Sequence, residues 1–237
     1  MHICDIYICS MATNRYSSHQ AAAAMLAHLV AAALITLVLV WLLHFRGGLA
    51  FKSDNKAKIF NLHPLLMIIG FVLFSGEVIF VCIAMMAYKT VPANRKRQKV
   101  FHLVVHLIAL LAGILGVYAV FDYHKQSKII HLYTLHSWLG ITTISLFAFQ
   151  WVVSLLTFWY PGAQESAKGR LSRWHVVVGV PIFAMMILSA ETGVVEKFIF
   201  LGLRRNQEAL ILNLIGLFIF IFALSVALTL ALPRYNS

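Results

Sequence analysis

The chain has 237 residues, of which 61% are hydrophobic and only 11% are charged, and its net charge is +11. Soluble domains contain about 45–50% apolar and about 25% charged residues, so the composition excludes an ordinary soluble domain and indicates a polytopic membrane protein. The basic residues lie in short segments between apolar runs, which argues against a nucleic-acid partner.

Six apolar runs follow one another, and each is long enough for a membrane helix, which needs about 20 mostly apolar residues. They cover residues 21–43, 63–87, 100–121, 135–159, 174–195 and 209–232. The connections between them are short, so consecutive helices should pack as antiparallel neighbours. The sequence therefore predicts an all-α membrane protein with a single six-helix domain in the lipid bilayer over residues 21–232. We expect a disordered N-terminal tail at 1–20 and a short C-terminal tail at 233–237.

The orientation in the membrane follows from the basic residues next to the helices. An even number of spans places both termini on one side, and the densest basic cluster, RKRQK at 95–99, stands on that side directly before the third span. Basic residues close to a span favour the cytoplasmic side. We therefore expect both termini in the cytoplasm.

Four histidines stand at the starts of helices two to five, one on each helix. In chain order they are His63, His102, His136 and His175. Because the helix direction alternates, the first and third fall in one leaflet and the second and fourth in the other. Each pair offers two neutral imidazoles to one iron, and an iron with two axial histidines suits electron transfer. The pattern predicts that helices two to five form a four-helix bundle around two b haems.

Three alternatives compete with this interpretation. Single interfacial histidines are ordinary, but four intramembrane ionisable residues paired by topology indicate a function. A histidine relay in a haem-free transporter or proton channel, or a zinc site, would need the histidines gathered in one place. A quinol-linked di-haem cytochrome subunit would use the same pairs. Geometry alone also allows His106, one turn after His102 on the same helix face, to replace it as a ligand.

The four histidine segments, IFNLHPLLMIIG, KVFHLVVH, LYTLHSWLG and RWHVVVG, resemble the haem-ligating segments of the cytochrome b-561 family. The segments FRGGLAFKSDNK, FAFQW, WYPG and ETGVVEK extend the resemblance over about residues 30–215, and plant ascorbate-reducible members look most similar. The resemblance implies electron transfer from cytoplasmic ascorbate through two bis-His b haems to monodehydroascorbate or a ferric chelate on the other side. It also implies a homodimer and selects His102 over His106. We expect a vacuolar or other endomembrane location rather than the plasma membrane.

Basic residues flank two of these histidines on the cytoplasmic side, where an anion such as ascorbate would need cations. Lys99 precedes His102 by three residues and shares its helix face, and Arg95 lies seven residues before it. Lys168 and Arg170 stand before the histidine of helix five. The resemblance implies that Lys99, Arg95 and a residue near Lys168 and Arg170 hold ascorbate, with Lys99 catalytic. A positive-inside stripe without a ligand is the alternative.

Aromatic residues and one imidazole mark the opposite face. Tyr133 precedes His136 by three residues, and Tyr123 and His124 end the third helix at the same level. The resemblance implies that this aromatic–histidine pair and Tyr133 bind the acceptor, and we expect His124 to be the catalytic residue that relays a proton. Tyr123 alone would also fit an ordinary interfacial belt. For three polar residues inside helices we expect structural hydrogen bonds: Glu77, Gln150 and Glu191.

Overall fold

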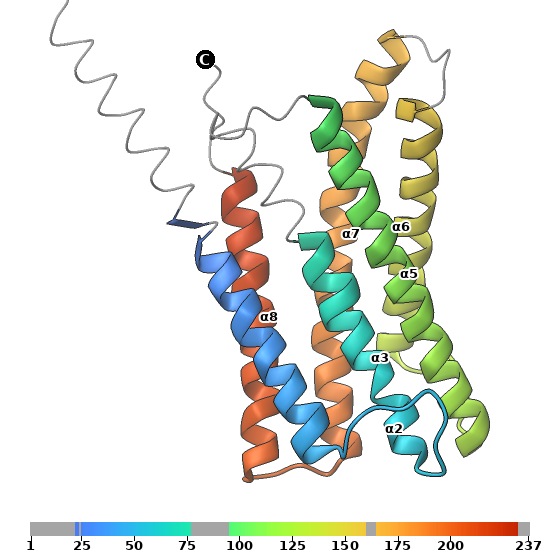
Figure 1. The fold of residues 1–237 in the computed structure, drawn as a ribbon, viewed down its shortest axis with the longest axis vertical. Coiled ribbons are helices and arrows are strands. Elements are labelled where there is room, and N and C mark those ends of the chain that lie inside the picture. The colour runs from blue at the N-terminus through green and yellow to red at the C-terminus, as the bar shows by residue number, and fades with distance from the viewer. Residues whose placement is uncertain (1–21, 24, 77–94, 160–164, 232–237) are drawn as a thin grey trace, which may run out of the picture.

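Six helices that are long and apolar enough to cross a membrane form one bundle in the computed structural model (Figure 1). The structure describes residues 22–23, 25–76, 95–159 and 165–231. The spans are Met25–Phe45, Lys56–Gly76, Lys99–Ser127, Leu135–Trp159, Lys168–Phe200 and Gln207–Leu228. Every regular element within these ranges is helical, which confirms the predicted all-α, six-span class. Both predicted tails, at 1–20 and 233–237, lie outside the described residues.

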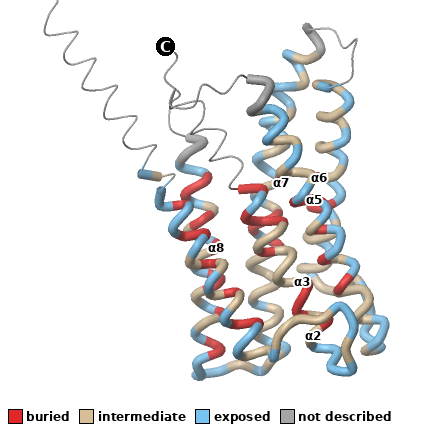
Figure 2. The backbone as a smooth tube through the Cα atoms, viewed as in Figure 1, coloured by how far each residue is buried: buried red, intermediate tan, exposed pale blue. Residues whose placement is uncertain are grey.

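The outer faces of the helices are apolar, as a lipid environment requires. Large hydrophobic side chains are exposed along α6 (Leu135–Trp159) and α7 (Glu165–Phe200), including Phe149, Leu156, Val176 and Val177. Buried residues follow the sides on which the helices face one another (Figure 2). A soluble protein rarely exposes so much contiguous apolar surface, so this belt is the surface that contacts lipid.

Two helices are longer than the sequence predicted. The helix α5 (Arg95–Ser127) has 33 residues and α7 has 36. At 1.5 Å per residue each measures about 50 Å, against about 30 Å for the hydrocarbon core. The predicted spans 100–121 and 174–195 were too short because hydropathy detects only the part inside lipid. Lysine, arginine and glutamine are good helix formers, so both helices continue into water.

Helix two is built of three consecutive pieces, α2 (Lys56–Phe60), α3 (Leu62–Leu65) and the π-helix η2 (Leu66–Leu73). Asn55 begins it by accepting a hydrogen bond from the Ala57 N–H at 3.1 Å, so the helix starts earlier than the predicted residue 63. Pro64 has no N–H to donate and interrupts the backbone ladder after α2. Residues 77–87 of the predicted span lie outside the described ranges. His63 therefore stands on an irregular stretch, and π-turns are frequent at functional sites.

Glu208 fixes one end of the bundle. It lies in the first turn of α8 (Gln207–Ala231), where the helix dipole favours a negative charge. Trp41, in η1 (Trp41–Phe45), donates to its Oε1 at 3.0 Å, and Arg46 Nη2 donates to its Oε2 at 2.8 Å. Asn61, 1% exposed, donates to the carbonyls of Arg46 and Gly48 at 3.1 and 2.7 Å. These bonds join the first helix, α8 and the start of helix two.

Replacing Glu208→Ala should destabilise the protein, because it leaves the Arg46 guanidinium without its carboxylate. Breaking a partly buried ion pair from one side costs roughly 1–3 kcal/mol. We expect a lower Tm in detergent for this variant, and a smaller loss for the double variant Arg46→Met/Glu208→Leu, which removes both charges. Asp54→Ala, at an exposed position, is the control. A Glu208→Ala protein as stable as Asp54→Ala would contradict this role.

Candidate functional site

His63 in α3 and His136 in the first turn of α6 face each other at one end of the bundle. Their ring centroids are 6.0 Å apart, with the planes at 84°. His63 Nδ1 lies 3.0 Å from the Gly116 carbonyl of α5, and His136 Nδ1 lies 2.9 Å from the Ser189 carbonyl of α7. A carbonyl oxygen only accepts, so Nδ1 carries the proton in both rings. Each neutral ring then keeps the Nε2 lone pair for a metal.

His102 in α5 and His175 in α7 form a second pair, with centroids 5.9 Å apart and planes at 67°. His175 Nδ1 lies 3.0 Å from the Ser154 hydroxyl of α6. His106 is oriented differently: its Nδ1 donates to the His102 carbonyl at 3.0 Å, and its ring stacks on Phe147 at 5.5 Å. The ring that opposes His175 is therefore that of His102.

The two pairs lie toward opposite ends of the four central helices. Helix two and α6 begin at the end of the bundle where α5 and α7 finish (Figure 1). Phe71 follows His63 by about 12 Å of helix and Phe147 follows His136 by about 16 Å. Their rings meet edge to face at 5.0 Å. Buried aromatic residues thus occupy the middle of the bundle.

The distances within both pairs fit two axial ligands on one haem iron. Imidazole nitrogen binds a first-row metal at about 2 Å, and the ring centre lies about 1 Å farther, so trans ligands have centroids about 6 Å apart. Gly193 lets the His136 ring lie close against α7, because a Cβ there would lie 2.7 Å from Cε1 of His136. The spacing of the two imidazole pairs therefore fits two bis-His b haems.

Basic residues stand at the end of the bundle nearest His102 and His175. Lys99 is exposed near the start of α5, Lys168 is half-buried and Arg170 is exposed near the start of α7. Both helices begin at this same end (Figure 1). Helix α5 extends back to Arg95, as the shared helix face required, although the Arg95 side chain lies outside the described part of the structure.

At the other end, Tyr123 and His124 close α5 beside helix two. The Tyr123 ring contacts Phe60 at 5.1 Å and His124 at 5.9 Å. The His124 ring lies 5.3 Å from that of His131, which stacks on Phe121 at 4.6 Å. His131 lies in the loop between α5 and α6, which folds back and brings its ring beside His124. The spacing of the two histidines in the sequence does not predict this contact.

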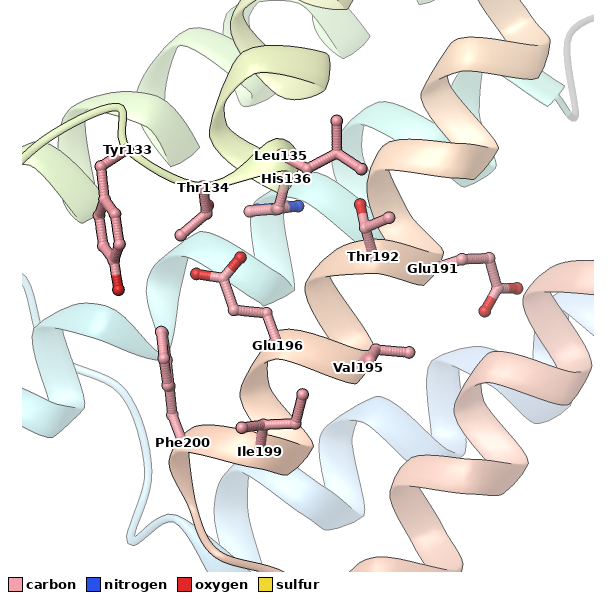
Figure 3. Close-up of a pocket in the computed structure, with 10 residues that line it drawn as sticks. All are labelled: Tyr133, Thr134, Leu135, His136, Glu191, Thr192, Val195, Glu196, Ile199 and Phe200. Carbon is pink, nitrogen blue, oxygen red and sulfur yellow. The ribbon is translucent and has the colours of Figure 1, made fainter.

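Tyr133 lines a groove of about 380 Å³ between the start of α6 and the last turns of α7. His136 and Glu196 also line it, and the Glu196 carboxylate points toward Thr134 and His136 (Figure 3). Glu191 points away, toward α8 (Figure 3). Tyr133 and His136 therefore line the same groove, beside the His63–His136 pair.

The polar residues inside helices have different surroundings. Gln150 donates to the His175 carbonyl at 3.4 Å, which is a structural bond between α6 and α7. Glu191 has a buried Oε1 without a hydrogen-bond partner in the described part of the chain, and Gly216 of α8 leaves space for its other oxygen. Glu77 lies outside the described residues.

Sequence reasoning missed the groups that orient the imidazoles. Two of them, at Gly116 and Ser189, are backbone carbonyls, which have no signature in the side-chain pattern. Ser154 could have been found, because a serine within an apolar helix often bonds across to a neighbouring helix.

Comparison with known proteins identifies the family. A profile described as eukaryotic cytochrome b561 matches residues 62–201, a range that includes all four paired histidines. The chain is 42% identical over 202 residues to transmembrane ascorbate ferrireductase 2 of Arabidopsis thaliana, covering 83% of this chain and 85% of that protein. It is 41% identical to ascorbate-specific transmembrane electron transporter 2 of Zea mays, covering 87% of each. It is 37% identical to a transmembrane ascorbate-dependent reductase of Sus scrofa, covering 77% of this chain and 71% of that protein. The match spans most of the chain, which therefore belongs to the cytochrome b561 family.

Proposed function

We propose that the protein is an oxidoreductase that carries electrons across a membrane from cytoplasmic ascorbate to an acceptor on the other side. The observation that carries the proposal is the presence of two opposed imidazole pairs, His63 with His136 and His102 with His175, toward the two ends of one bundle. The names of the relatives, transmembrane ascorbate ferrireductase and ascorbate-specific transmembrane electron transporter, support ascorbate as the donor and electron transfer across a membrane.

The four histidines would hold two non-covalent b haems. A haem bound there would supply one-electron transfer at its iron. At His63 and His136 the protein fixes the ring tautomer through the Nδ1 hydrogen bond to a carbonyl. The buried aromatic side chains of Phe71 and Phe147 fill the space between the pairs.

On the cytoplasmic side, Lys99, Lys168 and Arg170, together with Arg95, attract and hold the ascorbate anion. All four belong to the first turns of α5 and α7, the two helices that carry His102 and His175. Long helices that extend beyond the hydrocarbon core place these cations in water, where they meet the substrate. Lys99 is the catalytic contact because it lies one turn from a paired histidine.

On the opposite side, Tyr123, His124 and Tyr133 receive the acceptor, either monodehydroascorbate or a ferric chelate. The reductase names of the relatives support the ferric chelate. Monodehydroascorbate takes up one electron and one proton to become ascorbate, and His124 can deliver that proton. A ferric chelate takes up the electron alone.

We place both termini in the cytoplasm and the protein in a vacuolar or other endomembrane, and we expect a homodimer. The basic cluster at 95–99 supports this orientation, because it adjoins the third span on the side of the termini.

The first test is spectroscopic. The purified protein should show a b-type haem band that sharpens on adding ascorbate, and His63→Ala and His102→Ala should each lower the haem content roughly by half. His106→Ala, the matched control, should keep both haems.

The second test measures electron transfer across a membrane. In vesicles loaded with ascorbate, the wild type should reduce external ferric chelate or monodehydroascorbate. A folded but colourless protein would support a haem-free channel instead, and a coloured protein that ascorbate does not reduce would support a quinol-linked subunit.

Lys99→Gln should raise the KM for ascorbate about three- to ten-fold, because one charge-assisted contact is lost in a partly screened position. The haem spectra and potentials should not change. The effect should shrink at high salt, since ions screen exposed charges. Lys52→Gln, exposed at the opposite end of the bundle, is the control. An unchanged KM at low salt would leave Lys99 as an ordinary positive-inside residue.

His124→Ala should slow reduction of monodehydroascorbate by roughly 10²-fold at neutral pH, which is the lower range for loss of a general acid. Haem reduction by ascorbate from the cytoplasmic side should stay normal. His44→Ala removes an exposed histidine at the end of the first span and should have no effect. Normal acceptor kinetics in His124→Ala would exclude it from the acceptor site.

A further inference from the structure

Two basic side chains meet at the end of the bundle that contains His63 and His136. Lys197, in the last turns of α7, holds its Nζ 3.7 Å from the centre of the Phe60 ring. That ring lies 6.1 Å from the ring of His63. Lys197 is also within electrostatic reach of His63, Arg46 and Glu208. Lys197 therefore stands beside one histidine pair, and Arg46 and Glu208 are its charged neighbours.

The charges in this group do not balance. Arg46 and Lys197 contribute two positive charges, and Glu208 contributes one negative charge. Both oxygens of Glu208 are already engaged, one by Trp41 and the other by Arg46. One positive charge is therefore in excess, in a partly buried position where an unpaired charge is unfavourable.

Both cations also have unused hydrogen-bond donors. Arg46 Nε is buried and has no hydrogen-bond partner among the described residues. The ammonium of Lys197 has three donors, and the Phe60 ring over which it lies attracts its charge but offers no oxygen. The next carboxylate along α7, Glu196, points into the groove toward Thr134 and His136 (Figure 3). Neither Glu208 nor Glu196 therefore offers a free carboxylate to these donors, and an anion from outside the described part of the chain would satisfy them.

We propose that Arg46 and Lys197 bind the propionate carboxylates of the haem held by His63 and His136, an inference that rests on the proposed haem pair. Haem b carries two carboxylates, so it supplies both the missing negative charge and the missing acceptors. Guanidinium and ammonium groups bind carboxylates through charge-assisted hydrogen bonds. The proposal gives a role to two residues outside the histidine motifs, one of them on the segment after the first helix.

The proposal predicts that Lys197→Met lowers the reduction potential of one haem only. Loss of a nearby positive charge disfavours the state with the added electron. Methionine keeps the apolar stem against Phe60, so the packing is conserved. Lys197→Arg should restore the potential, and the exposed control Lys52→Met should leave it unchanged. The measurement is a spectroelectrochemical titration of the purified holoprotein that resolves both haems.

A second measurement separates propionate binding from a distant charge effect. Redox difference infrared spectra of holoprotein with ¹³C-labelled haem propionates should show carboxylate bands that move in Lys197→Met and return in Lys197→Arg. Unmoved bands or an unshifted potential in Lys197→Met would overturn the proposal. Those results are distinguishable from failure of the proposed function, in which the wild-type protein would contain no haem or would not be reduced by ascorbate.

Discussion

The proton on Nδ1 is the constraint on which the His63–His136 site depends. If that proton moved to Nε2, neither ring could bind a metal from the side that faces its partner. The carbonyls that hold the proton come from different helices, Gly116 of α5 for His63 and Ser189 of α7 for His136. The two rings and their two hydrogen-bond acceptors therefore come from four different helices, which are helix two, α5, α6 and α7. This is a physical reason for a four-helix bundle rather than a helix pair.

In the second pair, the hydrogen bond at His175 does not fix the ring tautomer by itself. His175 Nδ1 meets the hydroxyl of Ser154, and either atom could be the donor. Metal binding through Nε2 requires the imidazole to donate, which leaves the serine proton free for another acceptor. A hydroxyl also polarises a ring less strongly than a carbonyl held in a helix. The imidazoles of His63 and His136 therefore differ from that of His175 in the partner of Nδ1, and under the proposed function this difference would help to give two haems different potentials.

The sequence alone predicted the number of spans and the side on which each histidine lies, because alternation of helix direction is a topological rule. It left open whether His102 or His106 opposes His175, because both share one helix face. The structure distinguishes them through a local bond: His106 Nδ1 donates to the carbonyl four residues back, which turns its ring onto Phe147. Helix lengths, the carbonyl acceptors and the position of Lys197 were not predictable, since none leaves a periodic or compositional signal.

The first helix and α8 carry none of the four paired histidines, yet they bear on the position of His63. Helix two begins with short, interrupted pieces that alone would hold that ring poorly. Asn61, two residues before His63, is tied to the carbonyl of Arg46, and Arg46 is tied to Glu208 of α8. The first helix and α8 therefore anchor the start of helix two next to His63. Four helices carry the paired histidines, and the other two hold one of these histidines in place.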